Sequence, residues 1–164
     1  MSAQTSYKFS TQMGIAGGIV DLAPYAIDTF RNEENTGVML FGVGVVQGTA
    51  AGTEVALPGS SATAGVFEGI TVNNLTTEYD LEGIINIRKD AAIGVMRYGR
   101  IYARVADNIT PAYGDALYLV ITGDQKGFFT NTSGAGAVAV KGRFLGTVDS
   151  NRIAQVELFN QAQA

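Results

Sequence analysis

Residues 94–120 have the sequence GVMRYGRIYARVADNITPAYGDALYLV, and this stretch decides how the rest of the chain is interpreted. In its first half, small or aliphatic residues alternate with larger polar ones. Ile101 and Ala103 share one face of an extended strand. Arg100, Tyr102 and Arg104 share the other face. This alternation predicts a strand with one buried and one exposed face.

A turn and a second strand follow within the same stretch. Pro111 fixes its own φ angle and Gly114 tolerates a positive φ, so the chain is predicted to turn between them. Residues 116–121 are again typical of a strand. We therefore predict a central hairpin, or near-hairpin, within an all-β domain.

The composition removes most catalytic chemistry. The 164 residues are enough for a single domain, and they include no cysteine and no histidine. The usual zinc ligands, the thiol nucleophile and the commonest general base are therefore missing. We expect no catalytic residues, no cofactor and no metal. The 21 glycines indicate many turns rather than long helices.

The charge pattern argues against two classes of partner. A formal net charge of −4 does not suit a protein that binds nucleic acid through a basic surface. Residues 35–53 carry no charge, but Gly42 and Gly44 interrupt their apolar run, which is too short to span a membrane. We expect neither a nucleic-acid nor a membrane partner.

The N-terminal segment, residues 1–35, contains several glycines, and its large apolar residues follow no sustained period. Two interpretations remain open. The segment is either an extended arm that lies in a groove on its own domain or on a neighbour, or an irregular N-terminal strand of the same domain. We divide the chain into an arm, residues 1–35, and a β-domain, residues 36–164.

Three carboxylates, Glu78, Asp80 and Glu82, occupy alternate positions of a strand-like run. A calcium ion or the acid pair of a glycoside hydrolase would need such groups to converge on one point. Alternate strand residues instead point in parallel, about 6.6 Å apart. We therefore prefer a solvated acidic face, opposite Arg100 or Arg104.

The other strand-like runs are short and separated by turn residues. They lie at 38–46, 66–72, 84–87, 144–148 and 153–159. A turn at 149–152 would join the last two into a closing hairpin. We place Ala154, Val156 and Leu158 on the core side of that hairpin. About eight to ten short antiparallel strands are typical of a single small β-barrel or β-sandwich.

Short motifs of glycine and hydrophobic residues mark turns and strands along most of the chain. In order they are 17–21 (GGIVD), Pro24, 41–43 (FGV), 67–70 (FEGI), 99–103 (GRIYA), 114–115 (GD), 142–144 (GRF) and 153–156 (IAQV). In this order they resemble the head decoration, or cement, proteins of tailed bacteriophages. The motifs are structural, so no catalytic residue is carried over from that family.

The resemblance implies a small β-rich protein that binds the outer surface of the mature virion capsid, after synthesis in the bacterial host cytoplasm. Its expected partners are the major capsid protein, whose neighbouring subunits it would bridge, and other copies of itself, a trimer ahead of a dimer. The alternatives are a tail-tube or head-fibre protein and, more distantly, a carbohydrate-active enzyme that uses Glu78, Asp80 or Glu82.

Contact residues are expected in two places, the arm and the outward face of the strand near residue 100. Arg and Tyr are favoured at protein interfaces, although an ordinary exposed strand face holds the same residues. The predicted capsid or self-association contacts are Tyr7, Phe9, Ile15, Ile19, Arg100, Tyr102 and Arg104.

Overall fold

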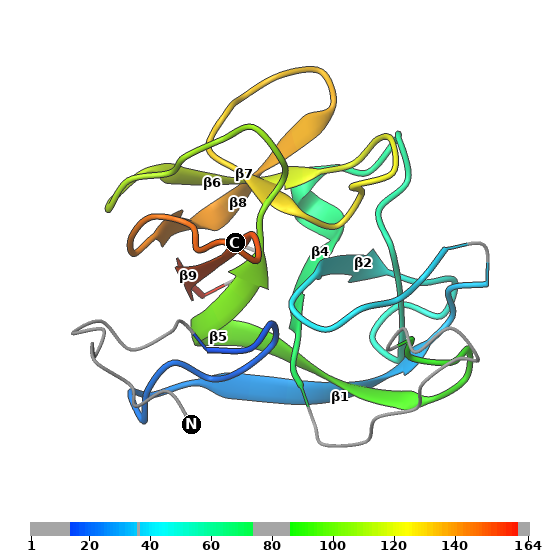
Figure 1. Cartoon of the computed structure of the whole chain (residues 1–164). Coiled ribbons are helices and arrows are strands. Elements are labelled where there is room, and N and C mark those ends of the chain that lie inside the picture. Colours follow the sequence, from blue (N-terminus) through cyan, green and yellow to red (C-terminus); the bar gives the residue numbers. More distant parts are fainter. Residues whose placement is uncertain (1–13, 36, 74–85, 161–164) are drawn as a thin grey trace, which may run out of the picture.

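The computed structural model describes residues 14–35, 37–73 and 86–160, so Tyr7, Phe9 and the carboxylates at 78–82 lie outside the described residues. The described part is built of strands and one short 3-10 helix, and none of its helices is long and apolar enough to cross a membrane (Figure 1). The elements are β1 (Ala26–Asn32), β2 (Gly44–Gln47), β3 (Glu54–Ala56), η1 (Ala64–Val66), β4 (Phe67–Thr71), β5 (Ala92–Arg104), β6 (Ala116–Val120), β7 (Phe129–Thr130), β8 (Ala137–Phe144) and β9 (Ile153–Leu158). The predicted all-β class is confirmed.

Five strands close into a small barrel. They follow the order β1-β3-β2-β4-β5, and β1 pairs in turn with β5. The pairing of β1 with β3 is parallel and the other four are antiparallel, so the barrel is mixed rather than wholly antiparallel. Phe30, Val45, Val55, Ile93 and Val95, from four of these strands, belong to one buried cluster. Burying such side chains is the main favourable contribution to the stability of the barrel.

The long strand β5 belongs to two groups of strands. Its first half pairs with β1 and β4, and its second half pairs with β9. The sheet then continues through β8, β6 and β7. A parallel bridge between Phe129 of β7 and Val105, the residue after β5, brings β7 back beside the end of β5. In Figure 1, β5 runs from beside β1 to beside β9. Ile101 and Ala103 are fully buried in the larger core of this second group, as their alternation predicted.

The predicted central hairpin is wrong. β6 lies between β7 and β8, and the second half of β5 pairs with β9. The reason is that the chain does not turn back directly after β5. The Val105 N–H donates to the Arg152 carbonyl and the Ala106 N–H to the Phe129 carbonyl, each at 2.9 Å or less. These bonds carry the connection to β6 away from β5.

Only the second strand of the predicted closing hairpin is confirmed, as β9; the first, predicted at 144–148, is wrong, because it shares only Phe144 with β8. β8 and β9 pair antiparallel, and Ala154, Val156 and Leu158 are buried. β8 begins earlier than expected and ends at Phe144. The predicted strand at 38–46 shortens to β2 because Gly42 has a φ of 74° and turns the chain before the strand begins.

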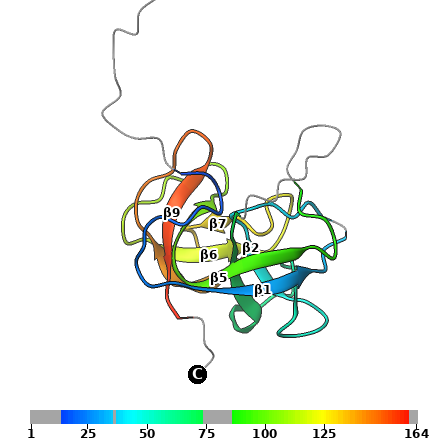
Figure 2. The same ribbon diagram turned by 90° about the horizontal axis from the view of Figure 1, so that it is seen from below.

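The sheet begins inside the segment that was predicted as an arm. β1 spans residues 26–32, and residues 17–20 are bonded to the outer edge of β5. The Gly17 N–H donates to the Tyr102 carbonyl at 2.7 Å, and the Tyr102 N–H donates to the Gly18 carbonyl at 2.9 Å. Figure 2 shows this stretch of chain, in dark blue, beside β9 and β5. An arm, which stays a prediction, would thus consist of residues 1–13.

Candidate interaction surface

A row of charged side chains crosses three neighbouring strands on the outward face. Arg100 of β5 and Arg143 of β8 are both register partners of Glu157 of β9. Arg100 Nε donates to one carboxylate oxygen of Glu157 at 3.1 Å, and Arg143 Nε donates to the other at 2.7 Å. Arg100 also reaches Asp21, with Nη1 to Oδ2 at 2.9 Å. A single carboxylate therefore fixes two guanidinium groups.

The row keeps its charges at neutral pH. Partial burial acts to raise the pKa of Glu157, but hydrogen bonds from Arg143 and Arg100 outweigh it and hold the pKa below its usual value. The Ala23 N–H, and then Arg100, lower the pKa of Asp21. Hydrogen bonds to Asp21 and Glu157 in turn raise the pKa of Arg100. Two cations and two anions make this row neutral overall.

Exposed aromatic rings extend the row beyond Arg143. The guanidinium carbon of Arg143 lies 5.5 Å from the ring centre of Tyr113 and 6.0 Å from that of Phe159. Such cation–π contacts hold an arginine in place without burying it. Tyr113 is 68% exposed and Phe159 is 44% exposed. Arginine and tyrosine held rigidly in this way are typical of the residues that dominate binding energy at protein interfaces.

Four of the predicted contact residues lie together at the other end of the row. The Arg100 and Tyr102 side chains point outward from β5, and Ile19 forms a bridge with Ile101 beside them. Ile15 is 63% exposed in the same N-terminal stretch. A Cβ on Gly14 would lie 2.6 Å from Cδ2 of Tyr102, so the chain passes directly over that ring.

Arg104 is placed differently from Arg100 and Tyr102. Its Nε donates to the carbonyl of Phe41 at 2.9 Å, and burial lowers the pKa of its guanidinium group. This arginine joins β5 to the turn before β2, which is a structural contact. The acidic face predicted opposite it, at 78–82, is outside the described ranges. For Arg100, the acids opposite it in those ranges are Asp21 and Glu157.

Comparison with known proteins places the chain in a family. The sequence profile of the family described as structural cement protein (E217 gp24/Pam3 gp6) matches residues 3–159. The chain belongs to the phage structural cement protein family. The resemblance noted from the motifs is thereby confirmed. The chain is accordingly a non-enzymatic structural cement protein of a phage.

The fold of the cement protein also has a solved relative. A chain in the structure titled "The capsid of Myoviridae Phage XM1" aligns with a TM-score of 0.72 and 22% identity, over 99% of this chain and 100% of that one. No curated protein matches the sequence. The family assignment favours the capsid over the tail-tube and head-fibre alternatives.

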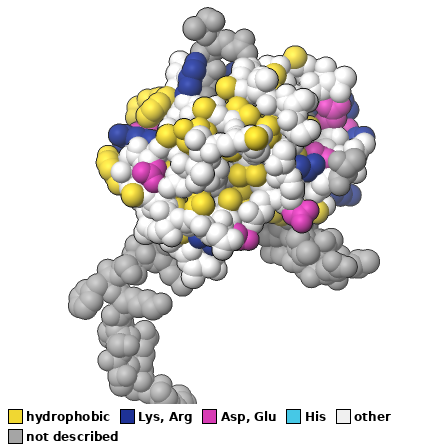
Figure 3. All heavy atoms as spheres, turned by 90° about the horizontal axis from the view of Figure 1, so that it is seen from above, with side chains coloured by type: hydrophobic (Ala, Val, Ile, Leu, Met, Phe, Trp, Pro, Cys, Tyr) yellow, Lys and Arg dark blue, Asp and Glu magenta, His cyan; other side chains and the backbone are white. Residues whose placement is uncertain are grey.

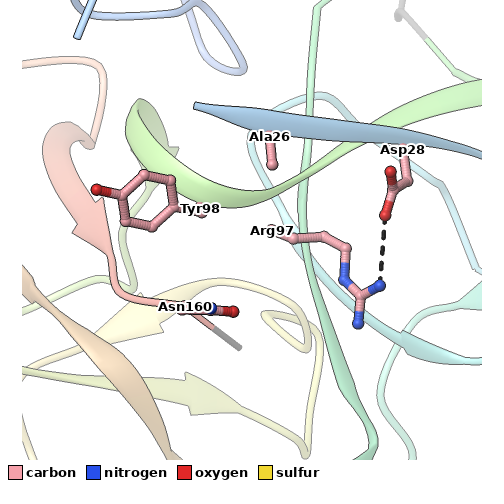
Figure 4. A pocket seen from close by; sticks show the side chains of 5 residues that line it. All are labelled: Ala26, Asp28, Arg97, Tyr98 and Asn160. Atoms are coloured by element: carbon pink, nitrogen blue, oxygen red, sulfur yellow. Dashed lines mark hydrogen bonds and ion pairs between the residues drawn. The ribbon is translucent and has the colours of Figure 1, made fainter. Parts of the chain in front are cut away.

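A second feature of the cement protein is a cavity where β1 meets β5. It has a volume of about 540 Å³ and is lined by Ala26, Asp28, Arg97, Tyr98 and Asn160 (Figure 4). Arg97 forms ion pairs of 3.3 Å with both Asp28 and the buried Glu68. Asp28, Arg97 and Glu68 together carry a net charge of −1, although Glu68 itself does not line the cavity. No cluster in the described ranges has the makeup of a metal centre.

A third feature is a face with few charges. Figure 3 shows the molecule from above, with hydrophobic side chains spread over the middle of the face and charged ones mainly toward its margins. In Figure 1 the upper side is formed by the connections from β3 to β4, β5 to β6, β6 to β7 and β7 to β8. Residues 57–66 and 129–140 contain no charged residue. This face differs chemically from the row of arginines and carboxylates on β5, β9 and β8.

Sequence reasoning missed three residues at one end of the row. Arg143, Tyr113 and Phe159 lie far apart in the sequence, and only the pairing of β8 with β9 brings Arg143 to Glu157. The sequence feature that could have identified Arg143 was the predicted closing hairpin. Its register would have placed Arg143 opposite Glu157 had β8 been assigned its correct bounds.

Proposed function

We propose that the cement protein binds the outer surface of the mature head and stabilises it by bridging neighbouring major capsid protein subunits. The observation that carries this proposal is the presence of two chemically different surfaces on one domain. One is the row from Asp21 to Arg143 on β5, β9 and β8, and the other is the face with few charges in Figure 3. A bridging protein needs at least two such contact surfaces.

The row provides a contact that is specific without being strongly charged. Its side chains are held in place by ion pairs and cation–π contacts, so little conformational freedom is lost when a partner binds. Because the row is neutral overall, long-range attraction contributes little. Geometric fit to a partner surface would set its specificity.

Self-association would multiply weak contacts. A homo-oligomer, a trimer ahead of a dimer, would present several copies of the row to the shell at once. Binding of one copy raises the effective concentration of the next, so individually weak contacts hold the assembly firmly. The bridged subunits would then resist separation together.

The experiment that tests this function is co-sedimentation with shells. Purified protein is mixed with cognate phage heads assembled without it, in expanded form and, as the control, in unexpanded form. We expect saturable binding to expanded heads alone, at a fixed ratio to the major capsid protein. Folded protein that binds neither form would remove the proposal.

A further inference from the structure

The outer edge of β1 is open over much of its length. β3 pairs with β1 at Arg31 and Asn32 only. The Arg31 N–H points to this side and donates to the Thr53 carbonyl at 2.9 Å. Backbone groups of alternate residues point the same way, so the N–H and C=O of Thr29 face the same edge. Within the described ranges, no strand covers β1 there between residues 26 and 30.

The cavity shown in Figure 4 lies beside this edge. Ala26 and Asp28 share a face of β1, and both line the cavity. A strand added at the open edge would direct every second side chain onto that same face. An extended segment would thus gain backbone hydrogen bonds from β1 and a side-chain site from the cavity, which are the two components of recognition by strand addition.

The cavity favours a cationic side chain with an aliphatic stem. Asp28 is the acid and Arg97 the base among the lining residues. Arg97 is also paired with Glu68, which lies outside the lining and is almost fully buried, so the three groups together carry one negative charge. The carboxylate of Asp28 lies at one end of the cavity, and Ala26 and Tyr98 form an apolar wall beyond it (Figure 4). Lysine stems pack along such apolar surfaces while the ammonium group reaches an acid.

The N-terminal segment of the chain has the matching chemistry. Lys8 is the only charged side chain in residues 1–20, and it lies between Tyr7 and Phe9. Thirteen residues precede Gly14, which lies over the Tyr102 ring on the outer face of β5. In extended form they reach at most about 45 Å. A domain of this length has a radius of gyration of about 15 Å, so the segment is long enough to reach a neighbouring copy.

We propose that residues 1–13 of a second copy add as a strand to the outer edge of β1, with Lys8 in the cavity beside Asp28. Tyr7 and Phe9 would then lie on the opposite face of the added strand, beside Thr29. This inference rests on the self-association included in the proposed function, and it names the segment and the site that join the copies.

The test uses the absence of cysteine from the chain. One variant carries Ala26→Cys in the cavity wall, and a second carries Ser6→Cys or Ser10→Cys, which have the same parity as Lys8. Equal amounts are mixed and oxidised, both free in solution and on saturated shells. The products are separated by mass, and linked peptides are identified by mass spectrometry. Ala112→Cys, at another exposed alanine, is the matched control for Ala26→Cys.

We expect a disulfide between two chains at Ala26→Cys, at least tenfold more abundant than at Ala112→Cys. Adding Lys8→Glu to the Ser6→Cys or Ser10→Cys chain should remove most of it. Equal linking at both alanines, linking unaffected by Lys8→Glu, or no linking under either condition would overturn the inference. So would a link found only within one chain of a double variant. Shell binding by the wild-type protein is measured separately, so failure here leaves the proposed function standing.

Discussion

Gly69→Ala is expected to destabilise the protein by about 4 kcal/mol, because two separate costs add at this position. Gly69 lies in β4 with a φ of 155°, a conformation that residues with a side chain rarely adopt. A Cβ there would also lie 2.8 Å from Cγ1 of Val95 and 2.9 Å from the carbonyl carbon of Met96, with the Met96 carbonyl oxygen nearest of all. The contact is with backbone of β5, which cannot move without disturbing both groups of strands.

Gly52→Ala separates the two costs. Gly52 has a φ of 80°, but no atom lies within 4 Å of the position of its Cβ. Only the backbone cost remains there, about 1 kcal/mol. Urea unfolding followed by circular dichroism gives both free energies of unfolding. A loss at Gly69 no larger than the loss at Gly52 would contradict the close approach of β4 and β5.

Tyr113→Ala and Arg143→Ala are each expected to weaken shell binding by about 30-fold, which corresponds to about 2 kcal/mol. Tyr113 is largely exposed, so its removal should leave the fold intact while it removes a ring that a partner would contact. Removing Arg143 leaves Glu157 with Arg100 alone and releases the contacts with both aromatic rings.

Binding is measured by titration against expanded shells. Lys89→Ala is the matched control, because it also removes one positive charge but lies in the turn before β5. The double variant should lose less than the sum of the two single losses, since the two side chains are in contact. Wild-type affinity in both single variants would exclude this end of the row from the shell contact.

The parts of the fold that depend on local sequence were predictable. The burial of Ile101 and Ala103 follows from alternation within β5, and the antiparallel pairing of β8 with β9 joins strands that are neighbours in the sequence. The pairing of β5 was not predictable, because Val105 bonds to Arg152 rather than to a residue just after the turn. Long-range pairing depends on which strands fit together in three dimensions.

In the candidate surface, too, the residues that local alternation marks were predictable and their long-range partners were not. Arg100 and Tyr102 were identified because they alternate on one strand. Their neighbours were not, since Glu157 lies 57 residues from Arg100 along the chain. Arg104, in contrast, was predicted as a contact residue but has a structural role. Its parity places it on the outward face, yet it bonds to the Phe41 carbonyl in the turn before β2. Neither contact leaves a signal in the sequence near residue 100.

The most direct test of the bridging role is the heat resistance of expanded shells with and without the protein. Shells saturated with wild-type protein and bare shells are heated in parallel, and the fraction that remains intact is counted by electron microscopy. Bridging predicts that saturated shells break at a higher temperature than bare shells, because separating two capsid subunits would also require breaking their contacts with the cement protein. The same breaking temperature at full occupancy would show that the protein binds the head without bridging its subunits.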